Sequence, residues 1–108
     1  MQFLITAYDG NDSEAGMRRS KARERHLEGV RKAVKEGRHL YGAAILDENN
    51  SMIGSIMIVD YPSKEILANE WLNNEPYVTG GVWKEIDVKP CKVPDVFVDR
   101  SFMQETNY

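Results

Sequence analysis

The sequence predicts a ferredoxin-like α+β fold, in which strands and helices follow one another in the order βαββαβ. Three observations support this prediction: four apolar segments alternate like strands, two segments repeat at helical spacing, and turn-forming residues separate them. A chain of 108 residues is the size of one domain. We therefore expect a four-stranded antiparallel sheet with two helices on one of its faces.

Three strands are expected in the first half of the chain. Residues 2–8 are apolar on both alternating sides, which is typical of a central strand covered on both faces. Residues 39–46 and 52–60 form the next two strands, and the turn-forming residues 47–50 connect them as a hairpin. The small residues 42–44 allow another group to approach the backbone of the second strand closely.

The long helix is predicted over residues 17–36. Leu27, Val30 and Val34 recur at helical spacing, and Gly37 stands where a helix ends. Nine lysines and arginines and three glutamates give residues 17–38 a charge of +6, in a chain whose net charge is −3. This segment is either an ordinary solvated helix face or a positive field that attracts an anionic small molecule.

The second half of the chain predicts a helix and a last strand. The helix covers residues 64–73 and ends before Pro76, because the residue preceding a proline avoids helical geometry. Residues 77–81 are expected to form a short turn. Residues 82–88 alternate like a strand, which Pro90 closes.

Two helices cover only one face of such a sheet, so the other face needs a cover. Facing sheets from two copies would supply it, and we expect a homodimer, or a higher oligomer, that closes a dimeric α+β barrel. The domain is predicted over residues 1–90, with a tail over residues 91–108. The tail carries Val96, Phe97, Val98 and Phe102, and we expect part of it to pack on a neighbouring chain.

Composition argues against several classes of protein. No apolar run is long enough to span a membrane. The single cysteine, Cys91, forms no internal disulfide, so a reducing cytoplasm is the simplest expectation. The acidic net charge and the lack of aromatic residues among the basic ones argue against a nucleic-acid partner.

His26 is the most interesting titratable residue. It shares a helix face with Ala22, Val30 and Ala33, and an imidazole moves protons readily near neutral pH. The alternative is a half-buried histidine bonded to a backbone carbonyl. His39 is expected to face solvent. The two histidines do not form a metal-ligand pattern, and no phosphate loop, nucleophile elbow, haem or flavin motif is present, so neither a metal nor a cofactor is expected.

Glu75 precedes Pro76, so it is held at a helix exit, and Gly80 and Gly81 let the chain turn into the last strand. By itself an acidic residue in this position usually only forms a turn.

Several short motifs follow one another along residues 3–90. They are Arg23-Glu24-Arg25-His26-Leu27, then Glu36-Gly37-Arg38 with Tyr41-Gly42, Ile53-Gly54-Ser55, Glu75-Pro76-Tyr77-Val78 with Gly81-Val82, and Val88-Lys89-Pro90. In this order and spacing the chain resembles the YciI-like (YCII-related) family of dimeric α+β barrel proteins.

The resemblance implies a site built on a His–Asp pair in a cleft. His26 matches the histidine, and Glu75 stands where the family usually has aspartate, which keeps the charge and adds a methylene. Ala43 or Ala44 stands where the family commonly has proline. A carboxylate that accepts one imidazole N–H fixes the tautomer and steadies the cation formed on protonation.

Four further residues are candidates for substrate binding. Ser55 is placed to donate a hydrogen bond to a bound anion, and Arg23, one helical turn before His26, to neutralise a carboxylate or phenolate. Tyr8 and Tyr41 are candidates to line the same cavity. The plainer alternatives are a surface arginine and tyrosines in the core or at the rim.

Two functions follow from these residues. The first is a small enzyme that performs proton-transfer chemistry, such as elimination, isomerisation or dehydrochlorination, on an anionic or aromatic small molecule. The resemblance supports it, since one kind of family member removes chloride from a hydroxylated aromatic compound. The second is a non-catalytic module that binds a small molecule or assists another protein.

Overall fold

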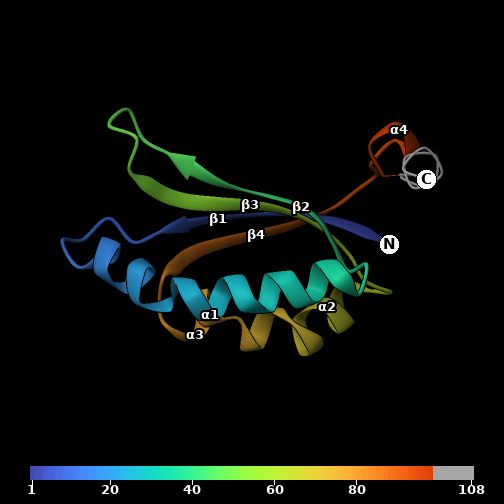
Figure 1. Cartoon of the computed structure of the whole chain (residues 1–108), viewed down its shortest axis with the longest axis horizontal. Helices are drawn as coiled ribbons and strands as arrows, with labels where there is room; N and C mark the ends of the chain where they lie inside the picture. Colours follow the sequence, from blue (N-terminus) through green and yellow to red (C-terminus); the bar gives the residue numbers. More distant parts are fainter. Residues whose placement is uncertain (99–108) are drawn as a thin grey trace, which may run out of the picture.

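The computed structural model describes residues 1–98 and confirms the predicted α+β fold. Its four strands are β1 (Gln2–Asp9), β2 (His39–Leu46), β3 (Met52–Asp60) and β4 (Trp83–Cys91). They form one antiparallel sheet in the order β2-β3-β1-β4, so that the first strand is central and the last is at an edge (Figure 1). This is the strand order of the ferredoxin-like fold.

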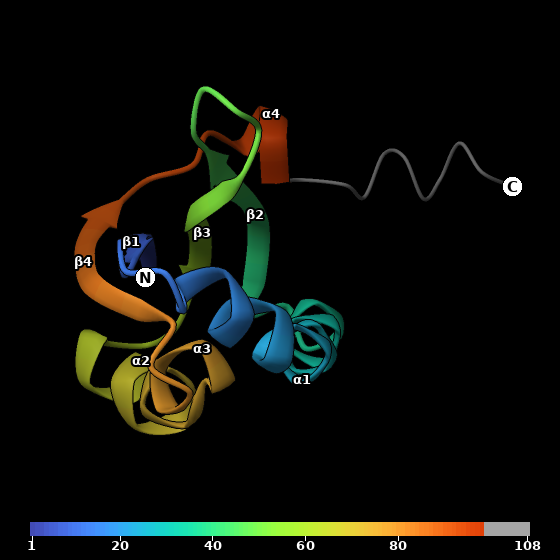
Figure 2. The same cartoon turned by 90° about the vertical axis from the view of Figure 1, so that its left-hand side faces the viewer.

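The helices lie mainly on one face of the sheet. Helix α1 (Ala15–Lys35) and the shorter α2 (Lys64–Glu70) and α3 (Pro76–Thr79) share that face, whereas α4 (Asp95–Val98) lies on the other side (Figure 2). None of the helices between residues 1 and 98 is both long and apolar enough to cross a membrane. The tail beyond Val98, including Phe102, lies outside the described residues, so its packing on another chain stays a prediction.

The predictions for the second half of the chain need two corrections. The expected helix over residues 64–73 is divided into α2 and a 3₁₀ turn, η1 (Leu72–Asn74), and the expected turn that follows contains α3. Pro76 can begin α3, because the first position of a helix needs no N–H from it.

Strand β4 also continues beyond its predicted end. It runs through Pro90 to Cys91, with Pro90 opposite Phe3 of β1. Proline is tolerated there because β4 is an edge strand, and an edge strand can leave an N–H position unpaired.

The buried face of α1 differs from the predicted apolar stripe. Leu27 and Val30 are only partly buried, and Val34 is 53% exposed. The buried positions of the helix are Ala15, Arg19, Ala22, His26 and Ala33. Small alanines and two polar side chains, Arg19 and His26, therefore face the protein interior.

Gly54 allows β1 and β3 to come together beside Ser55. A Cβ atom at Gly54 would lie 2.5 Å from the carbonyl oxygen of Ala7, which is too close for any other residue without a backbone shift. The glycine thereby lets Ser55, which pairs with Ala7 and is 5% exposed, face the helices.

Candidate active site

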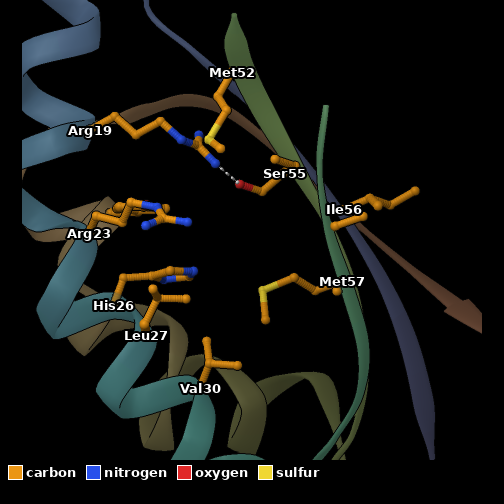
Figure 3. Close-up of a pocket in the computed structure, with 13 residues that line it drawn as sticks. Arg19, Arg23, His26, Leu27, Val30, Met52, Ser55, Ile56 and Met57 are labelled. Carbon is orange, nitrogen blue, oxygen red and sulfur yellow. Dashed lines mark hydrogen bonds between the residues drawn. The ribbon is translucent and has the colours of Figure 1, made fainter. Parts of the chain in front are cut away.

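A cavity of about 260 Å³ lies between α1 and the β2–β3 hairpin. In Figure 3 the side chains of Arg19, Arg23 and His26 extend from α1, and Ser55 and Met57 face them from β3. The other lining residues are Leu27, Val30, Met52, Ile56, Tyr77 and the small residues Gly42, Ala43 and Ala44. The small residues of β2 thus leave room for a ligand beside the histidine.

The structure brings His26 and Glu75 together although they are 49 residues apart in the chain. Nδ1 of His26 forms a hydrogen bond and ion-pair contact with Oε1 of Glu75. Both residues are buried, with exposed fractions of 8% and 2%. His26 is therefore bonded to a side-chain carboxylate, and the alternative of a backbone carbonyl partner was wrong.

Glu75 is held in place by its own helix. It is the N-cap residue of α3, and Oε1 accepts a second hydrogen bond from the backbone N–H of Tyr77 at 3.1 Å. Proline at the first helical position fixes the chain just after the glutamate. The longer side chain folds back onto the helix, so the added methylene does not separate the carboxylate from His26.

The imidazole ring is held between aromatic side chains. Tyr77 stacks on it with a ring-centre distance of 3.9 Å and an angle of 10°, and Trp83 approaches edge-on at 6.0 Å. Because Nδ1–H donates to the carboxylate, Nε2 carries the lone pair in the neutral ring. The ring points into the cavity (Figure 3), so a bound molecule can exchange a proton with Nε2.

A second buried group adjoins the histidine and was missed in the sequence. Arg19 is 7% exposed, and its Nη1 donates to both carboxylate oxygens of Asp9 at 3.0 Å. The guanidinium lies 4.8 Å from the centre of the Tyr77 ring. Arg19 precedes His26 by seven residues, or two helical turns, and that spacing is the signal that places it on the same face.

Arg23 is the predicted substrate-binding residue with a free charge. It is exposed and lines the cavity one turn before His26. Within residues 1–98 no carboxylate forms an ion pair with it, whereas Arg19 is paired with Asp9. Arg23 therefore gives the cavity wall an uncompensated positive charge.

Tyr8 and Tyr41 do not line the cavity, and that prediction was wrong. They are 43% and 66% exposed. Alternation along β1 turns Tyr8 away from the helices, and Tyr41 pairs with Ile58, which borders a groove on the opposite face of the sheet. Both tyrosines belong to the face that α1 does not cover.

His39 does not face solvent as predicted, because the first residue of β2 points into the core. It is 4% exposed, its Nε2 lies 3.4 Å from the hydroxyl of Tyr61, and the Trp71 ring stands edge-on at 4.5 Å. Burial, and to a smaller extent the nearby His26, lowers the pKa of His39 from 6.5 to about 4.

This lowered pKa predicts a pH-dependent loss of stability. Between pH 6.5 and about 4 the unfolded chain binds a proton at His39 that the folded chain does not, so the free energy of unfolding falls as the pH falls. The expected contribution is about 2 to 3 kcal/mol, complete above the unfolded pKa. Urea unfolding of the wild type and His39→Gln at about pH 7 and about pH 4.5 measures it. If the free energy of unfolding falls by the same amount with pH in both proteins, the prediction is wrong.

Among residues 1–98, no three His, Cys, Asp or Glu side chains gather closely enough to hold a metal ion.

Two bacterial proteins are similar to this chain in sequence. Protein YciI of Escherichia coli O6:H1 strain CFT073 is 33% identical over 98 residues, which cover 85% of this chain and 97% of that protein. An uncharacterised protein of Haemophilus influenzae strain KW20 is 35% identical over 99 residues, which cover 85% of this chain and 97% of that protein.

A solved structure shares the fold at lower sequence identity. It is 5-chloro-2-hydroxyhydroquinone dehydrochlorinase (TftG) from Burkholderia phenoliruptrix AC1100, in complex with 2,5-dihydroxybenzoquinone. The TM-score is 0.73 at 20% identity, and the match covers 89% of this chain and 98% of that one. The family model of the YCII-related domain matches residues 1–92. With that match and the identity to YciI, the chain belongs to the YCII-related family.

Proposed function

We propose that this protein is a small enzyme that transfers protons to or from an anionic or aromatic small molecule bound beside His26. The observation that carries the proposal is the buried pair of His26 and Glu75 at the wall of the cavity. A neutral imidazole whose Nδ1–H is held by a carboxylate presents Nε2 as a base to whatever occupies the cavity.

The chemistry that this pair supports is elimination or isomerisation. Nε2 of His26 takes a proton from the substrate, and the negative charge of Glu75 stabilises the imidazolium that forms. In an elimination, the electron pair of the bond to the removed proton forms a new double bond. The leaving group departs with the electron pair of its own bond to the substrate. In an isomerisation, the imidazolium returns the proton to a different atom of the substrate.

The lining of the cavity supports an anionic or aromatic substrate. Leu27, Val30 and Met57 supply apolar contacts, which suit a ring. Arg23 supplies the uncompensated positive charge, which suits a carboxylate or a phenolate. The fold shared with a dehydrochlorinase of a hydroxylated aromatic compound is consistent with this substrate class.

Chloride release from 5-chloro-2-hydroxyhydroquinone and related chlorinated hydroquinones tests the proposal. We expect turnover that depends on His26, and the effect of its replacement is argued in the Discussion. Tight binding of an aromatic acid with no product in any such assay would instead favour the non-catalytic module, provided that binding survives the loss of His26 and Glu75.

We also propose that the protein is a homodimer through the sheet face opposite α1. Within residues 1–98 only α4 lies on that face, where Tyr8, Tyr41 and Phe97 of α4 are at least 43% exposed. Isolated monomers rarely leave so many large apolar side chains together in water. Mass photometry at nanomolar and sedimentation at micromolar concentration are expected to show a dimer. A stable, well-folded monomer at micromolar concentration would contradict this proposal.

A further inference from the structure

Ser55 lies between two buried nitrogen donors at the wall of the cavity. Nη2 of Arg19 donates to its Oγ at 3.1 Å, and Nε1 of Trp83 donates to the same oxygen at 3.2 Å. Ser55 is 5% exposed and lines the cavity with His26. Figure 3 shows the Arg19 bond above the histidine, on the side of the cavity formed by β3.

These two bonds determine which hydrogen bonds Ser55 can still form. A hydroxyl group has two lone pairs and one hydrogen, and neither a guanidinium nor an indole nitrogen can accept a hydrogen bond. Both lone pairs of Ser55 are thus in use, and only its O–H is free to donate. No residue in the described part of the chain accepts that hydrogen.

The two donors are themselves fixed. Asp9 holds the Arg19 guanidinium through two bonds of 3.0 Å, and the side chains of this pair are 8% and 4% exposed. Trp83 is 4% exposed and stands edge-on against Tyr77 at 5.6 Å. Rotation of either donor away from Ser55 would leave a buried N–H without a partner, which is costly. A charged donor on Oγ also polarises the O–H bond and strengthens its donation.

We propose that Ser55 is a dedicated hydrogen-bond donor to a negatively charged oxygen of the ligand, a phenolate or enolate oxygen. Arg19 and Trp83 act as positioning residues that prevent Ser55 from accepting. The ligand therefore lies between Ser55 on β3 and His26 on α1. A catalytic role of Ser55 rests on the proposed function, because Ser55 would stabilise the negative charge that develops when His26 removes a proton.

The arrangement also predicts discrimination between ligands of the same shape. An anionic oxygen accepts the hydrogen bond that the Ser55 hydroxyl donates. An N–H group in the same place also needs an acceptor, and the Ser55 oxygen has no free lone pair to accept it. We expect the cavity to prefer 4-nitrophenolate over 4-nitroaniline, which has a similar ring and an amino group in place of the oxygen.

Binding of these two probes, followed by their visible absorption, tests the proposal at a pH where the phenol is ionised. The wild type is expected to bind 4-nitrophenolate and to shift its absorption band to shorter wavelength, as hydrogen bonding to the anionic oxygen does. Ser55→Ala is expected to bind it about 10- to 100-fold more weakly, with the band shift lost and 4-nitroaniline binding unchanged. Ser51→Ala removes the same hydroxyl from the exposed hairpin and is expected to change neither probe.

A second variant tests the positioning role without removing Ser55. Trp83→Phe keeps an aromatic ring and removes the N–H that occupies one lone pair, together with the five-membered ring that carries it. Ser55 can then accept as well as donate, so the preference for phenolate over aniline is expected to fall several-fold. A purely structural role of Trp83 would weaken both probes together and leave the preference unchanged.

Two results would overturn the proposal: equal affinity and equal band position in Ser55→Ala and the wild type, or no phenolate binding by the wild type at millimolar concentration. A failure of the proposed function can be distinguished from both of these results. Under this proposal His26→Gln still shifts the phenolate band, whether or not His26 is required for turnover.

Discussion

Replacing His26 by glutamine is expected to lower the rate of proton transfer by about 10²- to 10⁴-fold, the usual contribution of a positioned acid or base. Glutamine keeps an amide N–H that can reach the Glu75 carboxylate, so the buried charge keeps a donor and the fold should persist. Its amide cannot take up and release a proton near neutral pH. The loss therefore falls on the chemical step, and binding of the substrate should change far less.

The matched control is the other buried histidine. His39→Gln removes an imidazole of similar burial that packs against Trp71 and does not line the cavity. At about pH 7.5 this variant is expected to turn over substrate at close to the wild-type rate. Chloride release gives the rates, and thermal unfolding shows that each variant is folded. Full turnover by His26→Gln would remove the proposed function.

The sequence was most informative where local signals set the boundaries of an element. Strands β2 and β3 have the predicted limits, residues 39–46 and 52–60, because turn-forming residues flank both segments. It was least informative at Pro76, because the same residue can end one helix or begin the next. Only the packing of α3 against α1 and β4 selects the second possibility.

In the candidate site, too, local sequence signals identified single residues but not the contacts that depend on packing. Family resemblance drew attention to His26 and Glu75, but their contact depends on how α1 and α3 pack, which no short segment of sequence determines. The pairing of Arg19 with Asp9 was missed for that reason, because each residue by itself has the pattern of a surface charge or a turn. His39 was misplaced because a register shift in β2 separates it from Tyr41.

Replacing Glu75 by glutamine is expected to reduce turnover by about 10²-fold or more and to destabilise the fold by about 1 to 3 kcal/mol. Oε1 accepts hydrogen bonds from His26 and from the Tyr77 N–H, whereas Oε2 is buried without a partner among residues 1–98. In one orientation the amide places its NH₂ at the position of the buried Oε2, where two buried N–H groups need acceptors and are costly without them. In the other orientation it opposes the Tyr77 N–H and requires the opposite tautomer of His26, which protonates Nε2 and removes the base.

Glu75→Asp is the matched variant that separates charge from geometry. Aspartate keeps the negative charge and is a good N-cap for α3, so activity is expected to remain within about tenfold of the wild type. Nitrogen-15 NMR of the His26 ring should show Nδ1–H in the wild type and in Glu75→Asp, and a shift toward Nε2–H in Glu75→Gln. If the carboxylate acts through the imidazole, the His26→Gln, Glu75→Gln double variant turns over no more slowly than His26→Gln alone. Additive losses would mean that Glu75 contributes by a route that does not involve His26.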